Sequence, residues 1–427
     1  MRIALHCDRL SGWQGGRDFL YAIWEGLQLA CPPDHQLALI CGRKRDGFAW
    51  RLARISKYLL SQHSLRWSWI AQEFERKPYR KVLQATFGPK AKFLSVDVNG
   101  VEARRHRMGP LFDVIGPIDA PPSPAMGKAW LGYIPDCQHR HMPHFFSEQD
   151  RRWRDDSFLE LLKTAPVVIV GSANAKADLE NFYGRQYAEV VALPFSAAPN
   201  PEWLDIDPAK AVAKYHLPEY FFICSNQFWL HKNHRIVLEV IARAHAEERP
   251  VTVVFTGEMH DYRDPTYVPA LLKQVETYGI HQYCHFLGLI PKIEQIAIMR
   301  AAIALIQPTL FEGSPGGGAV HEAISIGQRV IVSDIQINRE ISRWVDAYFP
   351  PNNPAKLLKE MRLAEGAPKR QISKTALISQ GIERRQAFGA ALRSAYALAS
   401  KRCDGFDNQA VALGSEADFA HEVPRAA

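Results

Sequence analysis

The stretch 311–323, in a chain of 427 residues, carries residue types suited to holding phosphate. It reads FEGSPGGGAVHEA and follows an apolar run, 301–308, that predicts a buried strand. The residues after the glycines predict a helix. Gly316, Gly317 and Gly318 allow the backbone to approach a ligand closely, and the first N–H groups of a helix attract an anion. The stretch therefore predicts a phosphate cradle where a strand passes into a helix.

Two carboxylates bracket this cradle. Glu312 leaves the predicted strand and Glu322 lies about one turn into the helix, so both can face one ligand with its phosphates between them. A sugar nucleotide, with hydroxyls on both sides of a diphosphate, fits this pattern. No Walker lysine follows the glycines and no G-x-G-x-x-G occurs, which excludes the two commoner phosphate loops. A simple turn with a glutamate near a helix start is the structural alternative.

Glycines also precede the first predicted helix. Arg2–His6 predicts a strand, Ser11–Gly16 a loop and Arg17–Ala30 a helix. The first βα loop of a doubly wound sheet lies at the carboxyl edge, where ligands bind. Gly15 and Gly16 are therefore candidate ligand-binding residues, and a tight turn is the alternative.

A polar segment, 135–146, follows another predicted strand. It contains His139, His141 and His144 beside Asp136. H-x-H-x-x-H is not a usual zinc arrangement and the neighbouring arginines oppose a cation, so we predict no metal there. The preferred interpretation is that this polar segment, at the end of a strand, lines a site that faces a substrate. Buried, hydrogen-bonded histidines are the alternative.

The composition is ordinary for a soluble α/β protein, with 47% hydrophobic and 23% charged residues. No apolar run approaches a membrane span, and the first residues lack a basic region followed by a long apolar core. Seven cysteines are dispersed without a C-x-x-C pair, which favours reduced thiols. These features predict a cytoplasmic protein.

The segment 43–92 is strongly basic, with thirteen Lys or Arg residues against three acidic ones. Basic residues interleaved with aromatic rings suit an anionic membrane surface or an anionic acceptor, so peripheral binding at the inner membrane face is one hypothesis. No nucleic-acid-binding motif accompanies the charge, and we predict no nucleic-acid partner. A solvated basic face with core aromatics is the alternative. The aromatic residues are Trp50, Tyr58, Trp67, Trp69 and Tyr79.

Predicted strands alternate with helices in both halves of the chain, which indicates α/β domains with parallel sheets covered on both faces. Two such halves imply a cleft between them. We predict an acceptor-binding domain over 1–200 and a nucleotide-binding domain over 201–372, with the proline-rich stretch 194–208 as the linker. A helix over 373–400 then crosses back, and 401–427 is a flexible tail.

Several ordered motifs resemble those of the retaining GT-B glycosyltransferases of family 4, also called glycosyl transferases group 1. The resemblance is dense over 220–340, looser over 134–193 and faint at Gly15 and Gly16. It implies two Rossmann-like, doubly wound domains that face each other across a cleft. The motifs are FICSNQ at 222–227, HKNH at 231–234, FLG at 286–288, PTLFEG at 308–313 and SDI with NRE within 333–340.

The resemblance also implies roles for individual residues. Lys232 resembles the lysine that neutralises the donor diphosphate, and Glu322 resembles the glutamate that binds the ribose hydroxyls. Glu312 resembles the glutamate that holds the donor sugar. The glycines at 316–318 would offer N–H groups to the diphosphate or sugar, and those at 15–16 would close over the phosphates.

The chain departs from the family pattern at three points. The two glutamates are ten positions apart instead of the usual eight, and Gln227 stands where the family commonly has arginine. Pro135 replaces a frequent histidine, for which His139 or His141 can substitute as a catalytic residue. Gln227 and Gly288 join the predicted donor-binding set.

The predicted reaction is transfer of a sugar, with retention, from a nucleoside-diphosphate sugar to a glycan or lipid-linked acceptor in cell-surface polysaccharide assembly. We expect no cofactor and no metal, since no D-x-D motif occurs. One alternative is a sugar-nucleotide epimerase of the same architecture. Another is an inactive subunit that binds nucleotide sugars.

Overall fold

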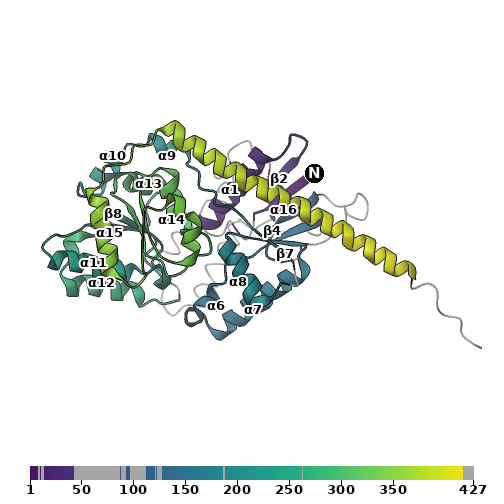
Figure 1. Cartoon of the computed structure of the whole chain (residues 1–427), viewed down its shortest axis with the longest axis horizontal. Coiled ribbons are helices and arrows are strands. Elements are labelled where there is room, and N and C mark those ends of the chain that lie inside the picture. Colours follow the sequence, from purple (N-terminus) through teal and green to yellow (C-terminus); the bar gives the residue numbers. More distant parts are fainter. Residues whose placement is uncertain are drawn as a thin grey trace, which may run out of the picture. The chain divides into compact units, whose positions relative to one another are not determined.

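The computed structural model describes residues 1–7, 10, 14–42, 87, 93–96, 112–120, 122, 127–185, 188–261 and 263–416. The chain divides into two compact units. One comprises residues 1–133, 164–168 and 392–427, and the other comprises residues 134–163 and 169–391. Figure 1 shows the helices and strands of the whole chain.

The first sheet has seven strands in the order β3-β2-β1-β4-β5-β6-β7. β1 pairs in parallel with both β2 and β4, so that Ile3 lies opposite Leu37 on one side and Val114 on the other. The strands are β1 (Arg2–His6), β2 (Gln36–Gly42), β3 (Phe93–Val96), β4 (Phe112–Ile118), β5 (Gly127–Tyr133), β6 (Val167–Val170) and β7 (Glu189–Ala192). The helices of this half are α1 (Gln14–Ala30), α6 (Gln138–His141), η2 (Pro143–Phe145), α7 (Glu148–Thr164) and α8 (Ala173–Tyr183).

The second sheet has six parallel strands in the order β10-β9-β8-β11-β12-β13. Counted from β8 this is the order 3-2-1-4-5-6 of a dinucleotide-binding sheet, and the strand order reverses between β8 and β11. The strands are β8 (Phe222–Ser225), β9 (Val253–Thr256), β10 (Cys284–Gly288), β11 (Leu305–Gln307), β12 (Val330–Ser333) and β13 (Ala347–Phe349).

Helices cover both faces of this second sheet. In Figure 1, α11, α12 and α15 lie on one side of β8, and α13 and α14 lie on the other. The helices between residues 230 and 366 are η3 (Leu230–Lys232), α11 (His234–Ala246), α12 (Tyr267–Tyr278), η4 (His281–Tyr283), α13 (Lys292–Ala301), α14 (Gly317–Ser325), η5 (Gln336–Trp344) and α15 (Pro354–Gly366). The last helix, α16 (Lys374–Glu416), contains residues of both compact units.

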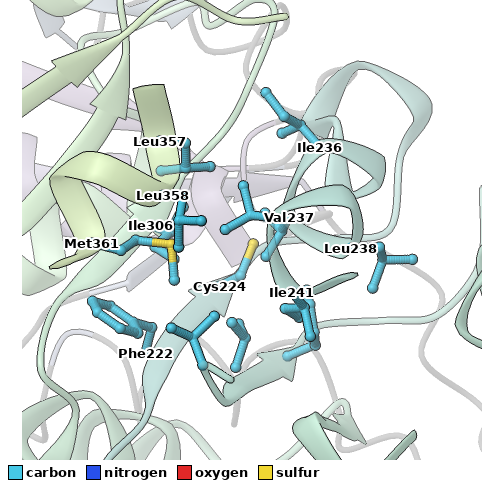
Figure 2. Packing of buried hydrophobic residues seen from close by; sticks show 14 of the residues in the cluster. Phe222, Cys224, Ile236, Val237, Leu238, Ile241, Ile306, Leu357, Leu358 and Met361 are labelled. Carbon is cyan, nitrogen blue, oxygen red and sulfur yellow. The ribbon is translucent and has the colours of Figure 1, made fainter. Parts of the chain in front are cut away.

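Alternate side chains of the second sheet enter two different cores. Phe222 and Cys224 of β8 pack with α11 and α15 in the cluster of Figure 2, whereas Ile223 packs on the opposite face. Successive residues of a strand point to opposite faces, so a strand that is covered on both sides must be apolar throughout. This explains the continuous apolar runs and confirms the predicted α/β fold with doubly wound parallel sheets.

Most predicted elements are present, but several boundaries differ. α1 begins at Gln14, so Gly15 and Gly16 lie in its first turn and not in the loop before it. The linker 194–208 is not irregular throughout, because α9 (Pro201–Asp205) and the start of α10 (Pro208–Lys214) lie within it. Each is capped by an Asn or Asp side chain that accepts a backbone N–H. The last helix, predicted over 373–400, continues to Glu416.

Most of the basic segment 43–92 lies outside the described residues, together with its five interleaved aromatic residues. Among the helices that are described, none is both long and apolar enough to cross a membrane.

Candidate functional site

The candidate site lies at the carboxyl edge of the second sheet, where the strand order reverses. β8 and β11 are neighbours that belong to opposite winding directions of the sheet, and ligands of such sheets bind outside this point. The chain that leaves β8 reaches Lys232 at the end of η3, and the chain that leaves β11 reaches Glu312. The two residues therefore flank the switch point.

Lys232 and Glu312 form a buried ion pair. The lysine Nζ donates to Oε1 of Glu312 over 2.6 Å, and each residue is 9% exposed. The other carboxylate oxygen faces the glycine turn, because a Cβ on Gly317 would lie 2.7 Å from Oε2. The ammonium of Lys232 and the turn at Gly317 thus meet at one carboxylate.

Two glycines shape the start of α14. Gly316 has φ of +71° and Gly317 has φ of +65°, a backbone region that side chains disfavour. A Cβ on Gly316 would also lie 2.5 Å from Cβ of Val320. Asn338 fixes the turn by accepting the N–H of Gly316 at 2.9 Å. Gly318 is exposed, and apart from its chain neighbours and the backbone of its own helix no described atom lies within 4 Å of where its Cβ would be.

Gln307, at the end of β11, connects these groups. Its Nε2 donates to Oε1 of Glu312 and to the carbonyl of Gly316, both at 2.9 Å. Its Oε1 accepts from Asn226 at 2.6 Å. The sequence analysis did not include Gln307, although a polar residue that ends an apolar strand run is the signal that would have found it.

Glu322 lies in a second polar cluster. It forms an ion pair with Lys292 of α13, and its Oε2 accepts from Gln295 at 3.2 Å. Gln295 also donates to Ser225 at the end of β8, at 2.6 Å. Glu322 is 8% exposed. Lys292 and Gln295 were missed from the sequence because α13 shows only a helical apolar pattern.

The two candidate histidines occupy different surroundings. His139 is 1% exposed, and its Nε2 lies 2.9 Å from Asp155 and 3.3 Å from Tyr183. Burial lowers its pKa, although Asp155 opposes the shift. The structure therefore places His139 in a buried hydrogen-bonded cluster.

His141 contacts the glycine-containing stretch. Its ring centroid lies 5.5 Å from that of Phe311, and its Nε2 lies 2.8 Å from Asp178. The neighbouring Gly313 packs against the polar segment as well, since a Cβ there would lie 2.8 Å from the carbonyl oxygen of Pro135. Of the two histidines, His141 is the one in contact with this stretch.

The remaining predicted donor residues lie on other loops. Gln227 follows β8 and is partly exposed. Gly288 ends β10 with φ of +66°, and its carbonyl accepts the N–H of Gly257 at 2.9 Å. Gly15 and Gly16 belong to the other compact unit, where Gly15 is exposed and Gly16 is buried. In the described part of the chain, no three His, Cys, Asp or Glu side chains gather as a metal site.

Solved glycosyltransferases share this fold at low sequence identity. HepE from Anabaena, crystallised with UDP and glucose, is 14% identical with a TM-score of 0.55, over 97% of this chain and 100% of HepE. Sucrose-phosphate synthase from Thermosynechococcus elongatus is 15% identical with a TM-score of 0.56, again over 97% and 100%. A glycosyltransferase from Rickettsia africae is 13% identical with a TM-score of 0.54, over 95% and 97%. The likeness shows the fold, which is the GT-B fold of two Rossmann-like domains.

Residues 207–380 match the family model described as glycosyl transferases group 1. The matched stretch contains the whole second sheet with Lys232, Glu312 and Glu322. No curated protein sequence matches the chain. Residues 207–380 are therefore similar to the glycosyl transferases group 1 domain, in agreement with the motifs of 220–340.

Proposed function

We propose that the protein is a retaining glycosyltransferase that uses a nucleoside-diphosphate sugar as donor and a glycan or lipid-linked molecule as acceptor. The observation that carries this proposal is the meeting of Lys232, Glu312 and the turn at Gly317 at the switch point. A cation and a helix start are groups that bind a diphosphate, and a carboxylate is a group that binds sugar hydroxyls.

The second polar cluster supports a nucleotide as the leaving group. Glu322 lies on the same helix as the glycine turn, and a carboxylate can accept hydrogen bonds from both hydroxyls of a ribose. UDP sugars are the first donors to test, because HepE was crystallised with UDP and glucose.

The chemistry requires stabilisation of charge on the departing diphosphate. As the glycosidic bond breaks, the sugar approaches an oxocarbenium ion and negative charge grows on the phosphate oxygens. Lys232 and the N-terminus of α14 stabilise that charge, and Glu312 holds the sugar hydroxyls. We propose that no metal and no cofactor takes part.

A hydrolysis assay tests the proposal without knowledge of the acceptor. A thermal-shift screen with UDP, GDP, dTDP and ADP sugars identifies the donor, since a ligand that binds the folded state raises its melting temperature. The donor is then incubated with the protein, and proton NMR follows the configuration of the released sugar. We expect slow hydrolysis with retention. Inversion would contradict the retaining mechanism.

The same assay separates the two alternatives. A sugar that changes configuration at another carbon while still attached to the nucleotide would indicate an epimerase. Donor binding without turnover, across a panel of glycan and lipid-linked acceptors, would indicate an inactive binding subunit.

We also propose that the acceptor belongs to cell-surface polysaccharide assembly at the inner membrane face. The support is the basic, aromatic composition of 43–92. Sedimentation with phosphatidylglycerol vesicles tests it, with phosphatidylcholine vesicles as the control. Equal sedimentation with both would argue against membrane association.

A further inference from the structure

The diphosphate of the proposed donor needs more positive charge than Lys232 supplies. The lysine Nζ lies 2.6 Å from Oε1 of Glu312 and both side chains are buried, so the pair is neutral as a unit. Gln227, on the same loop, carries no charge. A nucleoside diphosphate carries several negative charges, and a second cation next to Lys232 would offset them.

Arg263 lies on a loop that packs against the loop of Lys232. Strands β8 and β9 pair in parallel, so the segments that follow them leave the sheet at the same edge. These segments touch directly, because a Cβ on Gly257 would lie 2.0 Å from the carbonyl oxygen of Asn226. Arg263 therefore stands at the edge of the sheet that carries the candidate site.

The guanidinium of Arg263 contacts the residue directly before Lys232. Its Nη2 lies 3.2 Å from Nδ1 of His231. Burial and the charges of Lys232 and Arg263 lower the pKa of His231 to about 2, so the ring is neutral and Nδ1 accepts the hydrogen bond. His231 therefore positions Nη2 without placing a negative charge beside it.

One buried carboxylate aims Arg263 and fixes the neighbouring turn. Oδ1 of Asp261 accepts from the backbone N and from Nε of Arg263, at 3.0 and 3.3 Å. Oδ2 accepts from the backbone of Leu230 at 2.9 Å, at the start of the turn that ends at Lys232. The aspartate side chain is 1% exposed and that of Arg263 is 15% exposed. The Nε edge of the guanidinium thus forms an ion pair with Asp261, while Nη2 is directed toward His231. This pair, at 3.3 Å, is longer than the 2.6 Å pair of Lys232 with Glu312, and both oxygens of Asp261 also accept backbone N–H groups, so it offsets the charge of the arginine less.

Three neutral side chains also lie around the guanidinium. The rings of Phe146 and Trp229 have centroids 5.8 and 5.5 Å from its central carbon. Oε1 of Gln138 accepts from Nη1 at 3.4 Å, a long hydrogen bond. A phosphate oxygen that replaced the amide oxygen of Gln138 would form a shorter, charge-assisted hydrogen bond with Nη1. Replacement of the amide by an anion is therefore favourable.

We propose that Arg263 binds the diphosphate of the nucleotide donor together with Lys232 and supplies the positive charge that Gln227 lacks. The inference rests on the proposed function, because it takes a nucleoside diphosphate as the ligand. The planar fork of an arginine matches the oxygens of a phosphate better than an ammonium does. Arg263 is then a donor-binding residue that the motif comparison does not reveal.

Calorimetry with nucleotides and nucleosides tests this role. UDP, GDP, dTDP and ADP are titrated into the wild-type protein, and the tightest binder is then used with Arg263→Gln. We expect the variant to bind this diphosphate about 10- to 100-fold more weakly. Binding of the matching nucleoside, measured by ligand-observed NMR, is expected to stay within about twofold, because it lacks the phosphates. Arg243→Gln is the matched control, since Arg243 is an exposed arginine of α11 paired with Glu247.

Two further variants protect the test against a folding defect. Arg263→Lys keeps the charge but loses the fork, and we expect an intermediate affinity with an unchanged melting temperature. Adding Gln227→Arg to Arg263→Gln returns a cation to the loop of Lys232. We expect the double variant to bind the diphosphate at least about tenfold more tightly than Arg263→Gln does.

The outcomes distinguish this inference from the proposed function. Unchanged diphosphate affinity in Arg263→Gln, an equal loss for the nucleoside, or no recovery with Gln227→Arg would each overturn the role of Arg263 and leave the transferase proposal standing. A wild-type protein that binds none of the four nucleoside diphosphates would overturn both.

Discussion

Lys232 and Glu312 are 80 positions apart in the chain, yet the lysine Nζ lies 2.6 Å from the glutamate Oε1 and both residues are buried. They come from the loops after β8 and β11, the two strands between which the sheet changes winding direction. Burial of a charged side chain away from water costs free energy, and an ion pair offsets this cost only while both charged partners are present. The pair therefore links the stability of the loops to the chemistry of the site.

Lys232→Ala is expected to impair both transfer and stability. Loss of a cation at the leaving group should lower turnover about 100- to 1,000-fold. The unpaired Glu312 should lower the free energy of unfolding by about 3 kcal/mol. Urea denaturation and donor turnover measure the two effects.

The double variant Lys232→Ala with Glu312→Gln separates them. It removes the unpaired charge, so we expect most of the stability to return while turnover stays low. Lys374→Ala is the control, because Lys374 of α16 pairs with Asp205 and both side chains are exposed, and such pairs contribute at most about 1 kcal/mol. Recovery of turnover in the double variant would contradict a role for Lys232 in transfer.

Glu322→Ala is expected to weaken nucleotide binding through the ribose. Loss of hydrogen bonds to a charged acceptor should reduce affinity about 10- to 100-fold. The wild type should prefer the ribonucleotide over its 2′,3′-dideoxy analogue, and the variant should bind both equally. Glu247→Ala, at the exposed glutamate directly after α11, serves as the control. A preference for the ribonucleotide that persists in Glu322→Ala would place the ribose elsewhere.

Gly317→Ala tests the turn that starts α14. The added Cβ would lie 2.7 Å from Oε2 of Glu312, and φ of +65° is unfavourable for alanine. We expect a loss of about 1–2 kcal/mol in unfolding free energy and a marked fall in turnover. Gly366→Ala is the matched control, since that glycine lies in α15 and no described atom beyond its chain neighbours and its own helix backbone is within 4 Å of its Cβ position. Equal behaviour of the two variants would show that the turn tolerates a side chain.

The periodic pattern of the sequence predicted the sheets because burial on both faces leaves a visible mark, as in Phe222 to Ser225. The glycine turn could be predicted for a similar reason, since few residues other than glycine adopt its backbone angles. Contacts between side chains of distant elements leave no such mark. The pairing of Lys292 with Glu322 depends on how α13 and α14 pack, and a lysine near a helix start is common on any surface.

The prediction for Glu312 was limited for the same physical reason. Its position beside the glycines can be read from the sequence, but its ion pair with Lys232 arises only when β8 and β11 lie side by side. Its hydrogen bond from Gln307 depends on how the chain turns after β11. The start of α1 also escaped prediction. Glycines usually weaken helices, so Gly15 and Gly16 were placed in a loop, whereas the helix includes them in its first turn.

The stability of the protein is expected to fall as the pH decreases below about 6.5, and His321 of α14 contributes to this. Burial first, and then the charges of Arg385 and Arg384, lower the pKa of His321 to about 4 from an ordinary value of 6.5. Between these values the unfolded chain binds a proton that the folded chain does not, so the free energy of unfolding rises with pH. This contribution is fully present above pH 6.5 and is lost progressively toward pH 4.

Urea denaturation between pH 4.5 and 7.5 measures the effect. We expect His321→Gln to reduce the slope of unfolding free energy against pH by up to about 1.4 kcal/mol per pH unit, the value for one proton. The same substitution at the exposed His245 of α11 is the control and should leave the slope unchanged. Since His321 packs against Phe195 with ring centroids 4.3 Å apart, the variant also loses stability at pH 7.5, but that loss does not depend on pH. A slope that is the same in wild type and His321→Gln would mean that the folded chain protonates this ring as readily as the unfolded chain does.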